Sequence, residues 1–159
     1  GAIWSIIAFS LLGFGDKAGE YYRMINPIEH SRTKEAANKY KVEPYVISAD
    51  VYTQKNLAGR GGWTWYTGSS SWMYEAGIKY LLGLCIENGY LSIQPCIPSD
   101  WKEYSIKYKH GNSVYNIHVS NPNGKNNTVQ SFKLNGQEIP DKKIELNSAG
   151  EIYNVEVNM

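Results

Sequence analysis

Apolar residues recur every three or four positions over residues 2–25, which is the spacing of amphipathic helices. The segment GFGD at 13–16 interrupts this pattern with turn residues before it resumes. We therefore expect two helices joined by a tight turn. Asn26-Pro27 ends the second helix, and a short polar helix is expected around residues 34–40.

A further helix is predicted from Ser70 to Leu84, because apolar residues again fall on one helical face. They are Met73, Ala76, Gly77, Tyr80, Leu81 and Leu84. The serines at 69–71 can cap its amino end, and Asn88-Gly89 closes the segment. Residues 50–62 carry no such pattern and are expected to form a loop.

After Gly89 the apolar period changes from about 3.6 to 2, which predicts β-strands. The clearest alternating stretches are 104–109, 115–119 and 153–157. Turn sequences separate the strands: Gly111-Asn112, Pro122-Asn123-Gly124, Asn135-Gly136 and Ala149-Gly150. Short strands of this kind are typical of an antiparallel β-sandwich. The chain is thus predicted to be an α+β protein in two parts, with helices in residues 1–88 and strands in residues 89–159.

The helical part contains too few helices to close a bundle by itself. The sequence begins inside a helical pattern without Met, so we expect this part to complete a helical domain of a longer protein. Apolar surface is then expected to be exposed on Ile3, Trp4 and Ile6 or their neighbours. Through it the helices would contact the remainder of the parent chain or a second copy in a homo-oligomer.

A hydrophobic share of 42% with 19% charged residues is enough for a folded core and excludes wholesale disorder. The formal net charge is +1 and no basic run occurs, so nucleic acid is not expected as a partner. Aromatic residues make up 13% of the chain, with five Trp and thirteen Tyr. Because such rings stack on ligands that are partly apolar and partly hydroxylated, this composition favours sugars.

Cys85 and Cys96 share no ligand spacing with the histidines, so no metal site is expected. Both are predicted to be buried free thiols of a reducing compartment. The longest apolar stretch, residues 2–14, is too short to span a bilayer and lacks the basic flank of a signal peptide. These features lead us to expect a cytoplasmic protein.

The densest chemical pattern is GRGGWTWYTGSSSWMY, where glycines, tryptophans and hydroxyl residues precede a predicted helix. Free amides at the amino end of a helix bind anions, aided by the helix dipole. The hydroxyl of Thr67 and the amides of Gly68 and Ser69 could thus hold a phosphate or sulfate. Trp63 or Trp65 would then form an apolar wall. Alternatively, the segment is a glycine-rich turn whose serines only cap the helix.

Upstream, Glu43 and Asp50 lie near Tyr45, as carboxylates and aromatic rings often do in sugar sites. No defined separation of an acid and a base marks a catalytic pair, so solvated or structural carboxylates are the alternative. His30 has no nucleophile beside it and is expected to be structural. No serine hydrolase elbow, Walker loop, dinucleotide fingerprint or zinc motif occurs in the sequence.

Four segments together resemble glycoside hydrolase family 94, the inverting glycoside phosphorylases, and most closely its β-1,2-glucan branch. They are GAIWSIIAFSLLGFGDKAGEYYRMINPIEHSRT, KVEPYVISADVY, GRGGWTWYTGSSSWMY and PCIPSDWKEYSIKY. The resemblance implies that residues 1–88 are the last helices of an (α/α)6 barrel and that residues 89–159 are the jelly roll that follows it. It also implies cleavage of β-glucosidic bonds by inorganic phosphate with inversion, giving α-glucose 1-phosphate, without any further cofactor.

In this family a carboxylic acid protonates the glycosidic oxygen while phosphate attacks the anomeric carbon from the opposite face. One carboxyl group suffices, and a firm anion site becomes the requirement. The resemblance places Thr67 and Gly68 on the family's phosphate-contacting Thr-Gly pair, with Ser69 beside them. The general acid belongs to a GDWNDG-like motif that these 159 residues lack, so no catalytic residue is assigned. The family's phosphate-binding histidine would directly precede Gly1, and His30 does not take its place.

By the same resemblance, Glu43, Tyr45, Asp50 and Trp65 are expected to border the sugar cleft. Relatives that act on β-1,4 bonds carry a Gln near Ala49-Asp50, so this departure favours a β-1,2 linkage. The expected partners are a β-glucan oligosaccharide, phosphate and the rest of the parent chain.

Two other functions are compatible with the sequence. The first is the chain-length-controlling domain of a cyclic β-1,2-glucan synthase, whose parent would lie in the inner membrane. The second is a non-catalytic carbohydrate-binding module built on the jelly roll, with the helical part as a docking surface.

Overall fold

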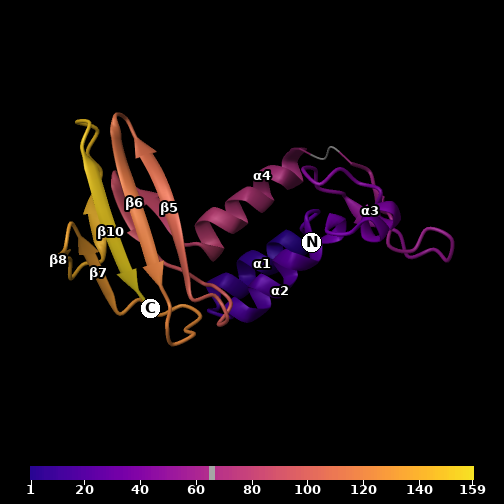
Figure 1. Ribbon diagram of the computed structural model, residues 1–159, viewed down its shortest axis with the longest axis horizontal. Coiled ribbons are helices and arrows are strands. Elements are labelled where there is room, and N and C mark those ends of the chain that lie inside the picture. The colour runs from indigo at the N-terminus through magenta and orange to yellow at the C-terminus, as the bar shows by residue number, and fades with distance from the viewer. Residues whose placement is uncertain (65–66) are drawn as a thin grey trace.

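The computed structural model describes residues 1–64 and 67–159. The molecule is elongated, with a layer of helices in its middle, β-sheets at one end and residues 26–64 at the other (Figure 1). It is therefore an α+β chain whose β part follows the helices, as the change of apolar period predicts.

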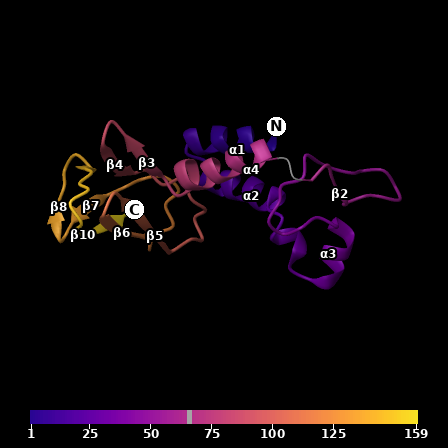
Figure 2. The same ribbon diagram turned by 90° about the horizontal axis from the view of Figure 1, so that it is seen from above.

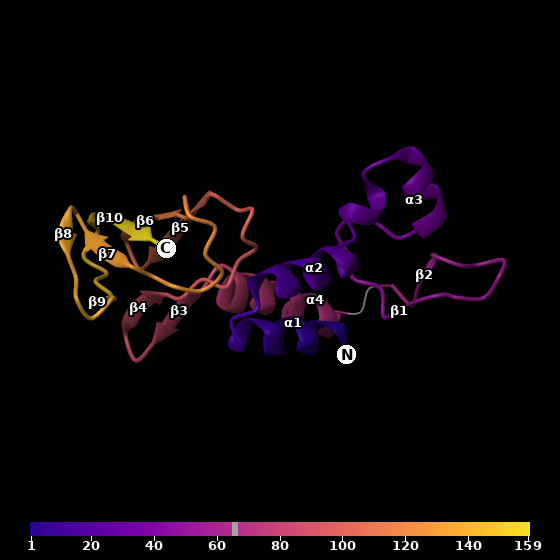
Figure 3. The same cartoon turned by 90° about the horizontal axis from the view of Figure 1, so that it is seen from below.

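The middle layer consists of α1 (Ala2–Leu11), α2 (Gly15–Ile25) and α4 (Thr67–Glu75), which lie side by side (Figure 2, Figure 3). α4 continues into a π-helical segment, Ala76–Leu81. The apolar faces of these helices meet in one buried cluster, formed by Ile6, Ile7, Ala18, Ala76 and Leu81. The first two predicted helices and the turn between them are confirmed.

The helix predicted over residues 70–84 both begins and ends earlier. It begins at Thr67, so the serines at 69–71 lie within it and do not cap it, and it ends at Leu81. The amide of Leu82 donates to the carbonyl of Gly77 at 2.9 Å, which is the i to i−5 bond of a π-helix. Gly83 then takes a φ of 74° that favours glycine, and a Cβ there would overlap the backbone of Gln94. Leu84 consequently starts β3 (Leu84–Glu87), and the prediction that it lies on a helical face is wrong.

Part of the helical layer exposes apolar side chains. Trp4 is 57% exposed, and its ring centroid lies 4.6 Å from that of Trp72, which is also exposed. Leu11 and Leu12 are exposed as well. The expectation for Ile6 is wrong, because Ile6 belongs to the buried cluster and has no exposed surface.

Residues 26–64 form smaller elements. They are the 3-10 turn η1 (Glu29–Ser31), α3 (Lys34–Tyr40), β1 (Asp50–Val51) and β2 (Gly61–Gly62). The expected polar helix is confirmed, and Thr33 caps it by accepting a hydrogen bond from the amide of Ala36 at 3.1 Å. The segment expected to be a loop, residues 50–62, begins and ends in the antiparallel pair β1–β2.

Two sheets make up the β part. The smaller has the order β3-β4-β9, where β4 is Tyr90–Ile93 and β9 is Lys143–Glu145. The larger has the order β5-β6-β10-β7-β8. Its strands are Glu103–His110 (β5), Ser113–Ser120 (β6), Ser131–Leu134 (β7), Gln137–Glu138 (β8) and Ile152–Asn158 (β10).

The larger sheet is mixed, which corrects the expectation of a wholly antiparallel sandwich. β10 runs parallel to β6, in the register Ile152 opposite Val114, and antiparallel to β7. Alternation of apolar residues gives the buried face of a strand but not its direction, so the sequence pattern could not distinguish the two pairings. The predicted turn at Asn135-Gly136 is confirmed between β7 and β8, with positive φ at both residues.

The two sheets enclose one core. Leu91, Ile93 and Ile144 come from the smaller sheet, and Ile117, Phe132, Val155 and others come from the larger one. Burial alternates along β6 and over most of β10, as the period of two predicts. The jelly-roll and barrel identities of the two parts stay predictions.

α2 is fastened to the chain segment that follows β4. A Cβ at Gly15 would overlap the carbonyl oxygen of Ile97, so only glycine allows this close approach. One carboxylate oxygen of Asp16 accepts hydrogen bonds from the amide and the hydroxyl of Ser99, at 2.7 and 2.9 Å. The backbone bond from Ser99 is the main reason why the pKa of Asp16 is lowered.

We expect the two hydrogen bonds from Ser99 to the carboxylate of Asp16 to make the stability of the fold depend on pH. The pKa of Asp16 is lowered in the folded state, so its contribution is complete above the ordinary Asp pKa of about 4 and is lost as the pH falls through the lowered value. Asp16→Asn should therefore lower the melting temperature at pH 7, and the difference from the original protein should vanish in strong acid. Thermal unfolding followed by circular dichroism from pH 7 down to about pH 2 measures this effect.

Asp100→Asn is the matched control, because Asp100 is an exposed carboxylate one residue from Ser99. It should change the melting temperature little at any pH. A difference for Asp16→Asn that stays constant as the pH falls would contradict the role of this carboxylate.

Candidate functional site

A cavity of about 240 Å³ lies where the amino end of α4 meets the start of α1. The same two ends lie close together in the views of Figure 2 and Figure 3. The cavity is lined by the ends of α1 and α2, the segment 47–51 and one residue of α4. These residues are Gly1, Ala2, Ile3, Met24, Ile25, Tyr40, Ile47, Ser48, Ala49, Asp50, Val51 and Ser69. The fold thus brings together two residues that the sequence analysis selected separately, Asp50 and Ser69.

The amino end of α4 is open. α4 begins at Thr67, so the following amides belong to the first helical turn, where no intrahelical acceptor exists. Gly68 is exposed, and a Cβ built on it would meet no atom within 4 Å. Ser69 is half-buried and lines the cavity. Among the residues that the structure describes, 1–64 and 67–159, no side chain packs against Gly68.

The paired strands β1 and β2 hold Asp50 at the cavity. Asp50 pairs with Gly62, and Val51 pairs with Gly61. The amide of Ala49 donates to the carbonyl of Gly62 at 3.2 Å, which extends the pairing by one residue. A Cβ at Gly61 would overlap the side chain of Val42, so this position requires glycine. Asp50 itself is exposed and lines the cavity, and its carboxylate lies beside Gly62, where a Cβ would overlap it.

Tyr40 and Ser48 form a polar wall that the sequence analysis missed. The Tyr40 hydroxyl lies 2.9 Å from the Ser48 hydroxyl, and both residues line the cavity. Tyr40 is the last residue of α3 and is buried, whereas the other residues of this short helix are polar or small. A single aromatic residue at the end of a polar helix was the available signal.

His30 is structural, as expected. Its ring stacks on Tyr40 with centroids 4.6 Å apart, and Nε2 lies 2.7 Å from the carbonyl oxygen of Met24. Because a carbonyl only accepts, Nε2 donates this hydrogen bond. His30 does not line the cavity and instead supports the ring that does.

The other predicted site residues that the structure describes do not line the cavity. Glu43 is half-buried and Tyr45 is 71% exposed, and neither lines the cavity. Trp63 is exposed with a φ of 48° and does not line it either. Trp65 and the side chain of Thr67 lie outside the part that the structure describes.

The polar lining residues of the cavity are Tyr40, Ser48, Asp50 and Ser69, and most of the others are apolar. Hydroxyl groups and a carboxylate beside apolar side chains suit a hydroxylated ligand. Within residues 1–64 and 67–159, no three His, Cys, Asp or Glu side chains gather in a way that could hold a metal ion. In the same residues no helix has the length and apolar character needed to cross a membrane. Of the two free cysteines, Cys96 is buried and Cys85 is partly exposed.

Residues 1–83 match the catalytic domain of the Glycosyl hydrolase 94 superfamily. This match ends where the structure changes from helix to sheet, since β3 begins at Leu84. The chain belongs to this family, as the four sequence segments indicated.

Curated relatives agree with this assignment. The chain is 42% identical over 119 residues to the cyclic beta-(1,2)-glucan synthase NdvB of Rhizobium meliloti (strain 1021), which covers 75% of this chain and 4% of that protein. It is 32% identical over 138 residues to an N,N'-diacetylchitobiose phosphorylase of Vibrio furnissii, covering 86% of this chain and 17% of that protein. It is 29% identical to a solabiose phosphorylase of Paenibacillus borealis over 100% of this chain and 20% of that protein.

The chain therefore spans a fifth or less of the length of these relatives. Their names combine two activities, phosphorolysis and glucan synthesis, on different sugars. The family membership thus supports a part of a glycoside phosphorylase or of a glucan synthase, acting in carbohydrate metabolism.

Replacing Gly61 tests how the wall of the cavity is held. In Gly61→Ala the new methyl group would be forced against Val42, which is buried with Tyr40 and Val46. Overpacking of this kind costs about 1–3 kcal/mol, so the melting temperature should fall. Val51→Ala is the matched control, because Val51 lies opposite Gly61 and is exposed; it should be nearly neutral. Equal stability of Gly61→Ala and the original chain would contradict the packing described.

Proposed function

We propose that this chain is the carboxy-terminal part of a glycoside phosphorylase and that the amino end of α4 binds the attacking phosphate. The observation that carries the proposal is the first turn of α4, where Gly68 is exposed and Ser69 lines the cavity that Asp50 also lines. Thr67, Gly68 and Ser69 would hold the anion through one hydroxyl group and the first amides of the helix.

The physical reason is charge. The amino end of an α-helix carries a partial positive charge of roughly half an elementary charge, which favours phosphate over a neutral ligand. Holding the phosphate also lowers the entropic cost of the reaction, because a bimolecular attack becomes a step between bound groups. In the proposed reaction a phosphate oxygen forms a bond to the anomeric carbon as the glycosidic C–O bond breaks. The proton that the leaving oxygen needs would come from an acid outside this chain.

The sugar would lie between the phosphate and the segment 47–51. Asp50 and Ser48 line the cavity and are suited to hydrogen bonds with hydroxyl groups. Glu43 and Tyr45 precede this segment and would border a wider cleft, with Trp65 as a further member. The 42% identity to a protein named cyclic beta-(1,2)-glucan synthase supports a β-1,2-linked glucan as the substrate.

That same similarity favours a second candidate function. The chain would then belong to the phosphorylase-like domain of a cyclic β-1,2-glucan synthase that adjusts chain length. The two candidates share the phosphate chemistry of α4 and differ in the rest of the parent protein. The sequence that precedes Gly1 in the parent gene distinguishes them.

Thr67→Val tests the phosphate site in the parent phosphorylase. Valine keeps the shape of threonine and removes one hydroxyl donor, which costs about 1–2 kcal/mol for a bond to a charged group. The KM for phosphate should therefore rise about 5- to 30-fold. Release of glucose 1-phosphate from β-1,2-linked glucooligosaccharides at varied phosphate concentration gives this value. Thr53→Val, the same change at an exposed loop position, should leave it unaltered.

An unchanged phosphate dependence in Thr67→Val would remove the main support for this site. A decrease in turnover without a change in the KM for phosphate would also count against it, since the hydroxyl is proposed to bind the anion in the ground state.

The chain of 159 residues by itself is expected to be inactive. The family's GDWNDG-like acid motif is absent from it, so phosphate would attack without protonation of the leaving oxygen. Incubation of the purified chain with phosphate and β-1,2-linked glucooligosaccharides should release no glucose 1-phosphate. Detectable, phosphate-dependent release would show that the acid lies within these residues.

A further inference from the structure

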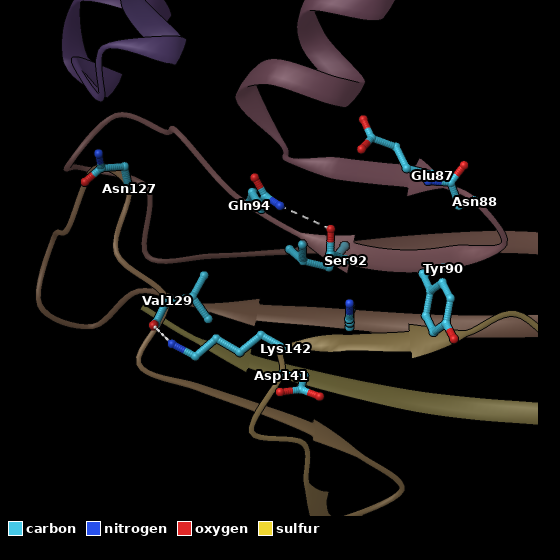
Figure 4. A pocket seen from close by; sticks show the side chains of 11 residues that line it. Glu87, Asn88, Tyr90, Ser92, Gln94, Asn127, Val129, Asp141 and Lys142 are labelled. Carbon is cyan, nitrogen blue, oxygen red and sulfur yellow. Dashed lines mark hydrogen bonds between the residues drawn. The ribbon is translucent and has the colours of Figure 1, made fainter.

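A polar groove of about 660 Å³ lies on the outer face of the small sheet, away from the cavity at α4. Figure 4 shows its side chains, which come from β3, β4 and the loops around residues 127 and 142. This volume falls within the usual range of ligand sites, about 300–1,000 Å³. Neither the family match, which ends at residue 83, nor the proposed phosphate site accounts for it.

β4 forms the floor of the groove. Tyr90, Ser92 and Gln94 alternate with Leu91 and Ile93, which are buried in the sandwich core. Because successive side chains of a strand point to opposite faces, Tyr90 and Ser92 both lie on the outer face. Gln94 directly follows β4, and its Nε2 donates to Ser92 Oγ at 3.3 Å, which places it beside them. From Tyr90 to Gln94 they extend over about 13 Å, which is four steps of an extended chain. The floor is thus a ring, a hydroxyl group and an amide in a row.

The neighbouring strands add charged groups to the same face. Glu87 lies opposite Tyr90 across the β3–β4 pair, and Lys143 lies opposite Ser92 across the β4–β9 pair. Lys143 Nζ lies 5.3 Å from the centroid of the Tyr90 ring, a cation–π contact that orients the ring. Tyr90 is nevertheless 42% exposed, so ring surface is available for stacking.

The far wall is formed by two loops. Lys142 Nζ donates to the carbonyl of Val129 at 2.6 Å, which joins the loops to each other (Figure 4). Asp141 and Asn127 also line this side of the groove. Asn127 comes from the loop that also touches the helical layer, since a Cβ at Gly13 would overlap its amide group.

A second cavity of about 450 Å³ continues the groove toward the helices. The two share three lining residues, Glu87, Gln94 and Asn127. The second cavity is also lined by Ser10, whose hydroxyl is buried without a hydrogen-bond partner among the described residues.

The charges of the joined groove nearly balance. Its charged residues are Lys79, Lys142, Lys143, Glu87 and Asp141. Two lysines are already engaged, because Lys79 lies 3.6 Å from Glu87 and Lys142 binds the backbone. Such a surface offers little attraction to phosphate. Amides, hydroxyl groups and an exposed tyrosine ring instead match a neutral, polyhydroxylated ligand that has an apolar face.

We propose that this groove is a second carbohydrate-binding site, which holds a segment of neutral glucan at a distance from the bond being cleaved. The choice of a β-1,2-linked glucan as its ligand rests on the proposed function. The phosphate cavity includes Ser69 at the amino end of the helix formed by α4 and residues 76–81, and the groove lies beyond the carboxyl end of that helix, on β3 and β4. The helix itself is about 20 Å long. A glucan that occupies both sites must therefore be longer than a disaccharide.

Titration of the 159-residue chain with a linear β-1,2-linked glucooligosaccharide, by isothermal calorimetry, tests the site. We expect saturable binding that Tyr90→Ala weakens at least about fivefold, because the stacking ring is lost. Gln94→Ala, which removes an exposed amide from the same floor, should weaken it as well. Tyr74→Ala is the matched control, since Tyr74 is an exposed ring on α4 outside the groove, and binding should be unchanged. Inorganic phosphate alone should not compete.

In the parent phosphorylase, Tyr90→Ala should raise the KM for long oligosaccharides and leave both turnover of a disaccharide and the KM for phosphate unchanged. Thr67→Val should raise the KM for phosphate and leave the KM for long oligosaccharides unchanged. The proposal is contradicted if the chain shows no saturable binding of the glucooligosaccharide. It is also contradicted if Tyr90→Ala and Gln94→Ala both bind this ligand as tightly as the original chain does. Failure of the phosphate site alone would appear as an unaltered phosphate dependence in Thr67→Val while the effect of Tyr90→Ala persists.

Discussion

The arrangement of the helices and sheets depends on one helix, α4 with its π-helical continuation. This helix is held in place by the burial of its apolar face. Ala76 and Leu81 are packed against α1 and α2 in the helical cluster, while Met73 is buried one turn earlier. At the amino end of this helix Ser69 lines the cavity of about 240 Å³, and its carboxyl end is followed by Leu82, Gly83 and then β3. A shift of this helix along its axis would move both of its ends. The packing of Ala76 and Leu81 against α1 and α2 therefore fixes the position of the cavity at one end and of β3 at the other.

Sequence patterns predicted most of the fold because its helices and strands follow their ideal periods. The α3 helix was predicted at residues 34–40 from its cap and its polar character, and it occurs there. Leu84 was assigned to a helix because its spacing from Leu81 continues the helical face. The sharp turn at Gly83 depends on the backbone of Gln94 eleven residues later, which no local pattern reveals. The parallel pairing of β6 and β10 is likewise a property of the chain path.

The sequence placed the start of the helix only approximately. It predicted a helix from Ser70 with the serines at 69–71 as caps, and the structure begins α4 at Thr67, so these serines belong to the helix. Asp50 was selected for its aromatic neighbours and does line the same cavity as Ser69. Tyr40 and Ser48 were missed because they meet only through tertiary folding, across the loop that follows α3. The groove on β4 was missed for a similar reason, since its face is assembled from three strands and two loops.

The most direct test of the phosphate site is a crystal structure of the parent phosphorylase with bound phosphate or sulfate. The account predicts an anion oxygen at hydrogen-bond distance, about 2.7–3.2 Å, from the amide nitrogen of Gly68 or Ser69. An anion bound elsewhere in the active site, with the first turn of α4 covered by side chains of the parent protein, would contradict it.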